Sequence, residues 1–290
     1  MLKGIYMKIQ SFFDKGTNTM TYIVFDEATK DAVVIDPVYN FDAPSGKLTQ
    51  ESFNLVKDFI KSQSLSLHYI LETHVHADHI SSSQLLKNEF PNAVTAIHEN
   101  IKIVQEVFAP VFNMGETCPC DGSQFDKLLA DKDILNAGSL EIKILSTPGH
   151  TPACVSFLIG DAIFTGDAVF MPDMGTGRCD FPKGDAEQLY DSLMKIYELP
   201  EDTRVFVGHD YGPGGREIAW ETTIKEQRQS NIQLKAGTSK EDFVTFRKNR
   251  DAQLNAPKLL LPSIQVNMKA GNLPDEDSNG TRYIKIPLSF

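Results

Sequence analysis

The chain has 290 residues, 41% hydrophobic and 23% charged, which is ordinary for a globular protein of one large or two small domains. Its formal net charge of −11 argues against non-specific binding to nucleic acid or to an anionic membrane. No stretch approaches the roughly 20 apolar residues of a membrane span, and the N-terminus lacks a signal-peptide core. We therefore expect a cytoplasmic protein whose four cysteines are free thiols.

The first third of the chain alternates strand-like and helix-like segments. Residues 21–25 and 32–37 are apolar and flank a polar turn, which predicts a β-hairpin. A loop rich in Pro, Gly and Asn is expected over 38–47. A helix should follow, capped by Thr49, because apolar residues recur at helical spacing after it.

The next segments continue this alternation. Residues 67–71 read as a buried strand, and a helix is expected to open at 81–87. A short strand at 93–97 and a helix at 99–107 follow. Residues 108–132 carry several Pro and Gly, so we expect a surface loop or insertion near the mouth of a site.

The second half is again β-rich and then helical. Four strands and a helix are predicted at 141–145, 153–159, 162–164, 185–198 (the helix) and 204–207. Gly160-Asp161 is typical of a tight turn between two of these strands. Further helices are expected over about 216–230 and, from a capping box at Thr238 and Glu241, up to about residue 254. The tail, 256–290, should hold two short strand-like runs. Periodicity alone indicates an α/β or α+β protein with a mixed sheet.

One dense cluster of polar residues lies between the strand at 67–71 and the helix that follows. His74, His76, Asp78 and His79 fall within six residues, although the chain has seven histidines in all. Because side chains two apart in an extended segment point the same way, His74 and His76 could share one cation. A strand-to-helix loop is also where α/β proteins place ligands.

Three later polar residues each end an apolar, β-rich run: His150, Asp167 and His209. Together with the cluster they make seven potential ligands. Imidazoles and carboxylates suit zinc, iron or manganese, and the absence of thiolates argues against a structural zinc site. We interpret His98 as structural, and Cys118-Pro119-Cys120 as a plain loop because no second Cys/His pair accompanies it.

The order HxHxDH, Gly-His, Gly-Asp, Gly-His over about residues 20–230 resembles the metallo-β-lactamase superfamily. The closer resemblance is to the ETHE1-like persulfide (sulfur) dioxygenases, especially their bacterial β-lactamase-like hydrolase branch. It is carried by the residues around the cluster, around 178 and after His209, namely 72–80, 177–181, 209–211 and 215–223.

The resemblance implies an α+β fold, an αβ/βα sandwich of two mixed β-sheets flanked by helices. It also implies a catalytic domain over 1–232. Residues 233–290 would add a C-terminal helix and an extended tail that packs on the domain or on a partner subunit. A homodimer or higher homo-oligomer is expected on the same basis.

Two ways of using the ligands are compatible with the sequence. In a hydrolase resembling glyoxalase II, one zinc is held by His74, His76 and His150, and a second by Asp78, His79 and His209. Asp167 bridges the two metals. A water between the metals then attacks a thioester or ester carbonyl.

The persulfide dioxygenases imply a different scheme, with one Fe(II) per chain held by His74, His150 and Asp167. Two histidines and a carboxylate leave positions open for a persulfide sulfur and O₂. Glutathione persulfide would give sulfite and glutathione, as in sulfide detoxification. The remaining four polar residues would orient the ligands, namely His76, Asp78, His79 and His209.

The flanking residues favour the dioxygenase scheme through the resemblance. Arg178 matches the family's arginine for glutathione, whose carboxylate a guanidinium suits, and Tyr211 matches its catalytic tyrosine near the substrate. The alternative interpretation of Arg178 is a solvated loop charge, and that of Tyr211 is a packing residue.

Two residues depart from the family. Cys179 stands where animal members have Thr, and Gln233 stands where a second basic anchor is expected. The substrate could therefore be another small persulfide, or a sulfurtransferase could be the partner. A catalytically idle metal scaffold is the third hypothesis, which the complete ligand set argues against.

Overall fold

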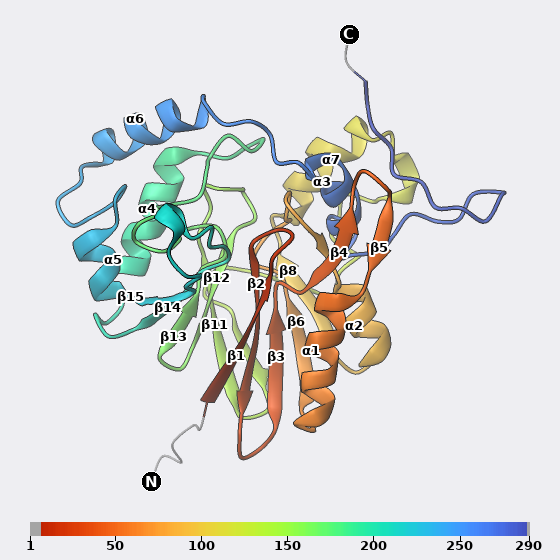
Figure 1. Ribbon diagram of the computed structural model, residues 1–290, viewed down its shortest axis with the longest axis horizontal. Coiled ribbons are helices and arrows are strands. Elements are labelled where there is room, and N and C mark those ends of the chain that lie inside the picture. The colour runs from red at the N-terminus through yellow and green to blue at the C-terminus, as the bar shows by residue number, and fades with distance from the viewer. Residues whose placement is uncertain (1–6, 289–290) are drawn as a thin grey trace.

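Two six-stranded β-sheets pack face to face, and helices cover the outer face of each sheet (Figure 1). This computed structural model describes residues 7–288. Both sheets are mixed, because each combines antiparallel and parallel neighbours. The expected α+β sandwich is therefore confirmed.

The first sheet has the order β1-β2-β3-β6-β8-β9. The first three strands pair antiparallel, and the last four pair parallel. The predicted hairpin is β2–β3, and β1 precedes it without having been predicted. The strands are β1 (Met7–Asp14), β2 (Thr19–Asp26), β3 (Asp31–Ile35), β6 (Ser66–Leu71), β8 (Val94–His98) and β9 (Lys127–Leu129).

The second sheet has the order β10-β11-β12-β13-β14-β15. All its neighbours are antiparallel except β13 and β14, which run parallel. Gly160 and Asp161 form the two-residue turn between β12 and β13, as predicted. The strands are β10 (Ile134–Ala137), β11 (Leu140–Ser146), β12 (Val155–Ile159), β13 (Ala162–Phe164), β14 (Arg204–Phe206) and β15 (Glu221–Thr223).

Helices cover the sandwich on both sides. Apolar residues of α1 and α2 pack on the first sheet, and those of α4, α5 and α6 pack on the second. α3 and α7 pack together near the edge where β8 ends. The helices are α1 (Glu51–Ser62), α2 (Ser83–Glu89), α3 (Ile101–Val111), α4 (Ala186–Tyr197), α5 (Ile224–Ser230), α6 (Lys240–Asp251) and α7 (Leu260–Asn267), with 3₁₀ turns at Gly115–Thr117 and Pro213–Gly215. No helix within residues 7–288 is long and apolar enough to cross a membrane.

The loop predicted over 38–47 is wrong, because these residues form most of a small sheet. β4 (Val38–Asp42) pairs with β5 (Lys47–Thr49) and with β7 (Ile80–Ser81). The turn residues Pro and Gly fall between the strands, where they allow the hairpin rather than break it. Thr49 ends β5 and does not cap α1, whose N-cap position is occupied by Gln50.

The first part of the helix predicted over 216–230 and the strand-like tail are also wrong, whereas residues 224–230 do form α5. Residues 216–220 are not helical, and 221–223 form β15, because pairing with β14 overrides local propensity. The predicted tail of strand-like runs contains α7 instead. Its Pro262 lies in the first turn, where a missing N–H costs no hydrogen bond. The N-cap of α6 is Ser239, one residue after the predicted Thr238.

The prediction of a surface loop over 108–132 holds only in part. Residues 108–111 complete α3 and 127–129 form β9, whereas the residues between them are irregular apart from a 3₁₀ turn, and many of them are exposed. Phe112, Cys118 and Phe125 are buried in the cluster between α3 and α7. The irregular sequence reflects tight turns that a packed apolar interior holds in place.

The core between the sheets includes a group of three aromatic rings. The ring of Phe164 lies 5.2 Å from that of Tyr22 and 5.1 Å from that of Phe206, measured between centroids. Phe164 and Phe206 are directly paired on β13 and β14. These strands lead into two of the loops that carry predicted ligands.

Replacing this central ring should destabilise the whole sandwich. Phe164→Ala leaves a cavity between the sheets, so we expect the free energy of unfolding to fall by about 3–5 kcal/mol. Leu55→Ala is the control, because Leu55 is 56% exposed on α1 and should change stability by no more than about 0.5 kcal/mol. Urea denaturation measures both, and equal losses would contradict the packing described.

Candidate metal centre

All seven predicted ligands lie on loops at one edge of the sandwich. His74, His76, Asp78 and His79 follow β6 in the first sheet. The other three come from the second sheet: His150 between β11 and β12, Asp167 after β13 and His209 after β14. Strand ends from both sheets thus bring together residues more than 130 positions apart in the sequence.

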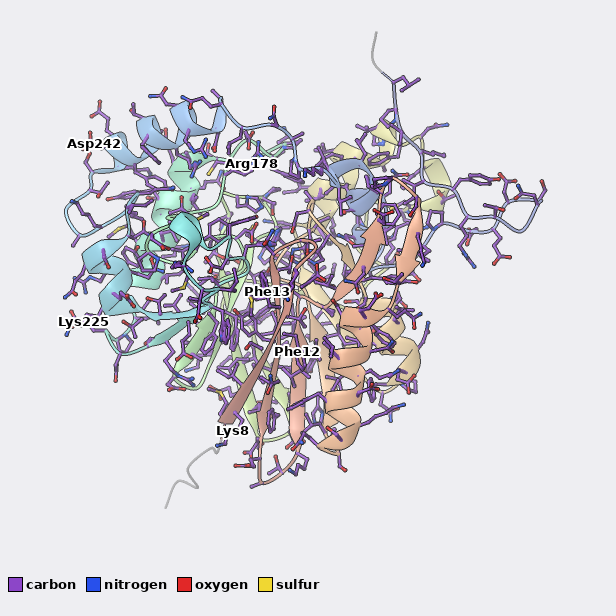
Figure 2. The ribbon with its side chains drawn as sticks, in the orientation of Figure 1. Lys8, Phe12, Phe13, Arg178, Lys225 and Asp242 are labelled. Atoms are coloured by element: carbon purple, nitrogen blue, oxygen red, sulfur yellow. The ribbon has the colours of Figure 1, made fainter. Side chains whose placement is uncertain are left out.

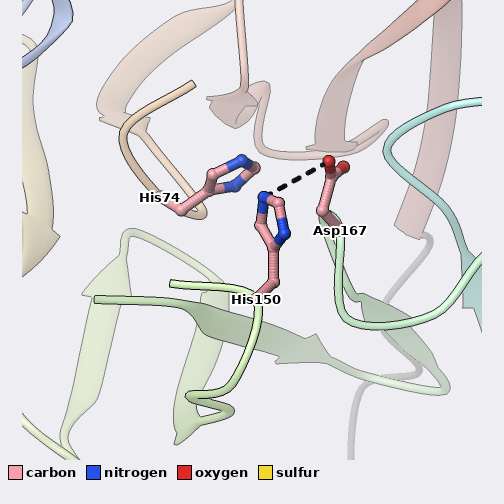
Figure 3. Close-up of side chains that lie close together, drawn as sticks. All are labelled: His74, His150 and Asp167. Carbon is pink, nitrogen blue, oxygen red and sulfur yellow. Dashed lines mark ion pairs between the residues drawn. The ribbon is translucent and has the colours of Figure 1, made fainter. Parts of the chain in front are cut away.

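Three of these side chains form the first group. His74, His150 and Asp167 each offer a ligand atom, and these atoms lie within 4.8 Å of one another. His150 Nε2 is 3.6 Å from Asp167 Oδ2. Figure 3 shows His74 reaching the group from a different side than the other two residues.

Each imidazole of this group is oriented through its other nitrogen. His150 Nδ1 lies 2.6 Å from the carbonyl oxygen of Arg178, to which it can donate. His74 Nδ1 lies 3.0 Å from the hydroxyl of Thr73, and that hydroxyl donates to Asp36 at 2.8 Å. These contacts fix the tautomer that leaves both Nε2 lone pairs free.

The free atoms of the group fit a metal ion. His74 Nε2 and Asp167 Oδ1 are buried and have no hydrogen-bond partner within the described structure. A buried polar atom without a partner is costly, and coordination would satisfy it. Burial lowers the pKa of His74 well below its usual value, and the neighbouring His76 and His150 lower it further. His74 is therefore neutral, which is the state that binds metal.

The Nε2 atom of His76 faces two carboxylates instead of this group. Its Nε2 is 3.0 Å from Asp36 Oδ1 and 3.3 Å from Glu72 Oε2. Burial opposes a charge on His76, but the two carboxylates outweigh it and raise the pKa well above its usual value. The Nε2 of His76 is thus taken up by the two carboxylates, while its Nδ1 is buried and has no hydrogen-bond partner within the described structure. The pairing of His74 and His76 on one cation stays a prediction.

A second group lies beside the first. His76, Asp78 and His79 also have ligand atoms within 4.8 Å of one another. His209 Nε2 is 3.3 Å from Asp78 Oδ2 and equally far from Asp167 Oδ1. Asp167 therefore lies between His150 and His209, as a bridging ligand would.

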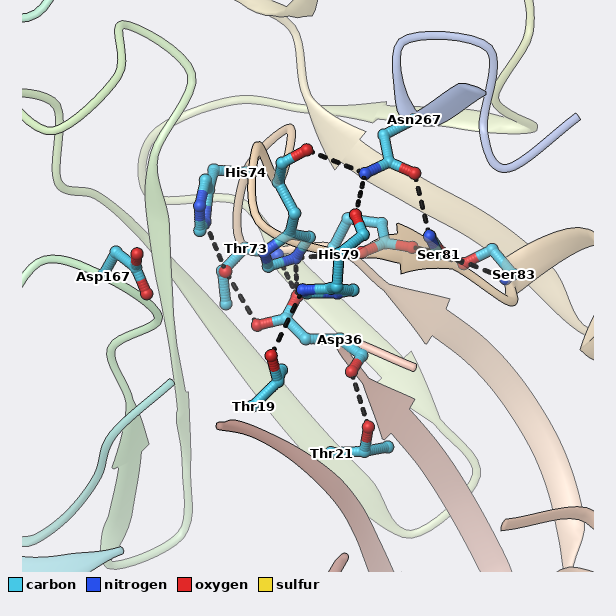
Figure 4. Close-up of polar contacts among 12 residues, drawn as sticks. Thr19, Thr21, Asp36, Thr73, His74, His79, Ser81, Ser83, Asp167 and Asn267 are labelled. Carbon is cyan, nitrogen blue, oxygen red and sulfur yellow. Dashed lines mark hydrogen bonds and ion pairs between the residues drawn. The ribbon is translucent and has the colours of Figure 1, made fainter. Parts of the chain in front are cut away.

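Sequence reasoning missed the residues that support the metal loops. Asp36, at the end of β3, accepts hydrogen bonds from the backbone and hydroxyl of Thr73. Asn267, at the end of α7, donates to the carbonyls of His76 and His79 and accepts from the N–H of Ser81 (Figure 4). A strand-end Asp before Pro was a usable signal, whereas nothing near Asn267 in the sequence pointed to the loop.

A cavity of about 1230 Å³ opens onto the first group. Its walls come from the metal loops, from the β4–β5 hairpin and from α6, and they include His150, Asp167, Arg178 and Tyr211. The cavity lining includes no residue of 108–132, so that stretch does not form the mouth as predicted.

The two predicted substrate residues both line this cavity. Figure 2 shows Arg178 at the end of the sandwich opposite Lys8. Its guanidinium donates twice to Asp180 and once to the carbonyl of Asn255, which leaves two of five N–H groups free. The ring of Tyr211 is stacked on that of His209, with centroids 6.1 Å apart.

Other residues singled out from the sequence have structural surroundings. Cys179 is buried outside the cavity lining, and its N–H donates to Asp251. Gln233 lines the cavity but accepts hydrogen bonds from Thr176 and Arg247. His98 is bound to Ser146 and lies outside the ligand groups. All four cysteines are free, as expected.

The model of the metallo-β-lactamase superfamily matches residues 15–209, which is more than half of the chain. The chain belongs to the metallo-β-lactamase superfamily. The match spans both sheets as far as His209, and it ends before α5, α6 and α7.

Curated relatives carry two kinds of name. The "Glyoxylase B2" of Dictyostelium discoideum is 49% identical over 98% of this chain and 97% of its own. The "Beta-lactamase hydrolase-like protein" of Agrobacterium fabrum is 45% identical over 97% of this chain and 64% of that protein. The human mitochondrial persulfide dioxygenase ETHE1 is 31% identical over 92% of this chain and 90% of its own.

A solved structure, that of ETHE1 from Myxococcus xanthus, superposes with a TM-score of 0.74. It is 33% identical and covers 92% of this chain and 100% of its own. The relatives thus establish the superfamily, while their names divide between hydrolases and dioxygenases.

Metal binding should depend on the first group. In His150→Ala and Asp167→Ala, one of three ligands is lost, so we expect the affinity for the metal to fall by at least about 100-fold, more than the loss of an orienting partner costs. The metal content after dialysis against a chelator measures this, and wild-type protein should retain one ion per chain.

His98→Gln is the control, because His98 is a buried histidine outside the ligand groups. Two tightly held ions per chain in the wild-type protein, or an equal loss in His98→Gln, would contradict the assignment.

Proposed function

We propose that the protein is an Fe(II)-dependent persulfide dioxygenase that oxidises glutathione persulfide. The observation that carries this is the division of the histidines. The ligand atoms of His74, His150 and Asp167 lie within 4.8 Å of one another, while the Nε2 of His76 faces Asp36 and Glu72 instead. Two histidines and one carboxylate are the donor set of non-haem iron oxygenases.

A bound Fe(II) would supply oxygen activation and a position for the persulfide sulfur next to O₂. The overall reaction consumes glutathione persulfide, O₂ and water and yields glutathione, sulfite and two protons. Two oxygen atoms of sulfite then come from O₂ and one from water. The terminal sulfur is oxidised, O₂ is reduced, and the sulfur–sulfur bond breaks.

The cavity residues would bind the organic part of the substrate. The two free N–H groups of Arg178 suit a glutathione carboxylate, although Asp180 already neutralises much of its charge. Tyr211 lies at the same cavity, against His209. Its hydroxyl is available to a bound persulfide, because the described structure gives it no hydrogen-bond partner.

The human relative named as a persulfide dioxygenase is 31% identical in sequence and supports this proposal. The ETHE1 of Myxococcus xanthus, which has a solved structure and is 33% identical in sequence, also supports it. The second candidate is a dinuclear zinc hydrolase of glutathione thioesters. It is favoured by the position of Asp167 between His150 and His209, and by the 49% identity to a protein named glyoxylase. The cytoplasmic setting, the homo-oligomer and a sulfurtransferase partner stay predictions.

Oxygen uptake by anaerobically iron-loaded protein tests the proposal. Given glutathione persulfide, wild-type protein should consume O₂ in step with sulfite formed, and His150→Ala and Asp167→Ala should lose this activity by at least about 100-fold, since each removes a ligand. No uptake, together with rapid hydrolysis of S-lactoylglutathione by the zinc form, would exclude the dioxygenase and leave the hydrolase.

The role of Arg178 can be tested separately. Arg178→Ala removes a carboxylate contact remote from the metal, so KM for glutathione persulfide should rise about 10-fold, or about 1.4 kcal/mol. The kcat should change little, because such binding is uniform between ground and transition states. Cysteine persulfide is the control substrate, and an equal rise in its KM would argue against glutathione recognition by Arg178.

A further inference from the structure

The segment from residue 233 to 267 lies beyond the part matched by the superfamily model. Its two helices, α6 and α7, lie on either side of the edge that carries the metal loops (Figure 1). Both helices send buried polar side chains to the backbone of those loops. We propose that these side chains are positioning residues for the metal site, and this inference rests on the metal site of the proposed function.

On the α6 side, the central feature is a buried ion pair. The side chains of Arg247 and Asp251 are 3% and 7% exposed, and Arg247 Nη2 lies 2.7 Å from Asp251 Oδ1. The second oxygen of Asp251 accepts the N–H of Cys179 at 2.8 Å. Burying an ion pair costs desolvation free energy. Apolar residues in the same place would avoid this cost if the contact served packing alone.

Arg247 also contacts the same loop directly. Its Nη1 donates to the carbonyl of Thr176 and to Gln233 Oε1. That oxygen of Gln233 accepts the N–H and the hydroxyl of Thr176 as well, and its amide nitrogen donates to Met174. The backbone from 174 to 179 is therefore held at four points by three side chains.

This loop touches two of the proposed ligands. The carbonyl of Arg178, within the held stretch, is the acceptor for His150 Nδ1. Gly177 passes so close to Asp167 that a Cβ on it would lie 1.9 Å from the Asp167 carbonyl. A shift of the loop would thus turn the His150 ring and displace the backbone of Asp167.

On the α7 side, the single residue Asn267 holds the first metal loop, which follows β6. Asn267 is 4% exposed and binds three backbone groups, the carbonyls of His76 and His79 and the N–H of Ser81. These bonds go to the loop that follows β6 and to β7 at its end. The two metal loops, one from each sheet, are therefore both held by the same C-terminal segment.

The test compares metal affinities of the full-length chain by chelator competition with Zn(II). In Arg247→Met and in Asn267→Leu we expect affinity to fall about 10- to 100-fold, as for other residues that orient ligands. Loss of a positive charge alone would strengthen cation binding, so weaker binding in Arg247→Met reports geometry. Wild-type affinity in either variant overturns the proposal for the loop concerned.

The matched control is Lys240→Met. It removes the same charge from the same helix and breaks an exposed ion pair with Asp191, but it does not contact the loop. It should bind zinc as the wild-type protein does, and an equal loss would overturn the proposal. If Arg247→Met does not fold, Gln233→Leu gives a comparison without any change of charge, because it removes the contacts to Thr176 and Met174.

A spectroscopic readout separates positioning from general destabilisation. In zinc-loaded protein with ¹⁵N-labelled histidine, Arg247→Met should shift the Nδ1–H resonance of His150, whose acceptor lies on the held loop. The resonance of His74, whose Nδ1 is bound to Thr73, should stay in place. An unchanged His150 resonance overturns the proposal. Zinc binding does not require persulfide oxidation, so failure of the oxygen-uptake test leaves this result independent.

Discussion

The site depends on a hydrogen bond to one nitrogen of each buried imidazole. His150 is held by a backbone carbonyl and His74 by the Thr73–Asp36 relay. Each bond fixes a tautomer and leaves the opposite nitrogen free, buried and aimed at a common point. A buried polar atom without a partner is unfavourable, so the fold is built to be completed by a cation.

The hydrogen-bond partners of the histidines also distinguish His74 from His76. His76 is buried like its neighbour His74, but it meets two carboxylates where His74 meets a hydroxyl. The carboxylates raise the pKa of His76, whereas burial lowers that of His74. Neighbouring histidines of one loop thus differ in charge through the groups that face them. Substitution of Asp36 would affect this division without touching a ligand.

The metal site also requires that residues far apart in the sequence lie close together, and the sandwich brings them together. Strands of both sheets end at the same edge, so that His74 and Asp167 come together from opposite sheets. The rigid aromatic core beneath them, around Phe164, fixes the spacing of the strand ends. The C-terminal helices then hold the loops that the strands leave, because loops alone are the most mobile part of such an edge.

The sequence by itself placed the seven candidate ligands at the ends of strands, because polar residues at the ends of apolar runs are a local pattern. The sandwich was expected from the resemblance to a family. The sequence also located most strands of both sheets. Only the tertiary structure decided β15, α7, the buried side chains within 108–132 and the partners of His76, because strand pairing, burial and charge neighbours join residues far apart in sequence. Asn267 shows this most clearly, since its contacts lie 186 or more positions away.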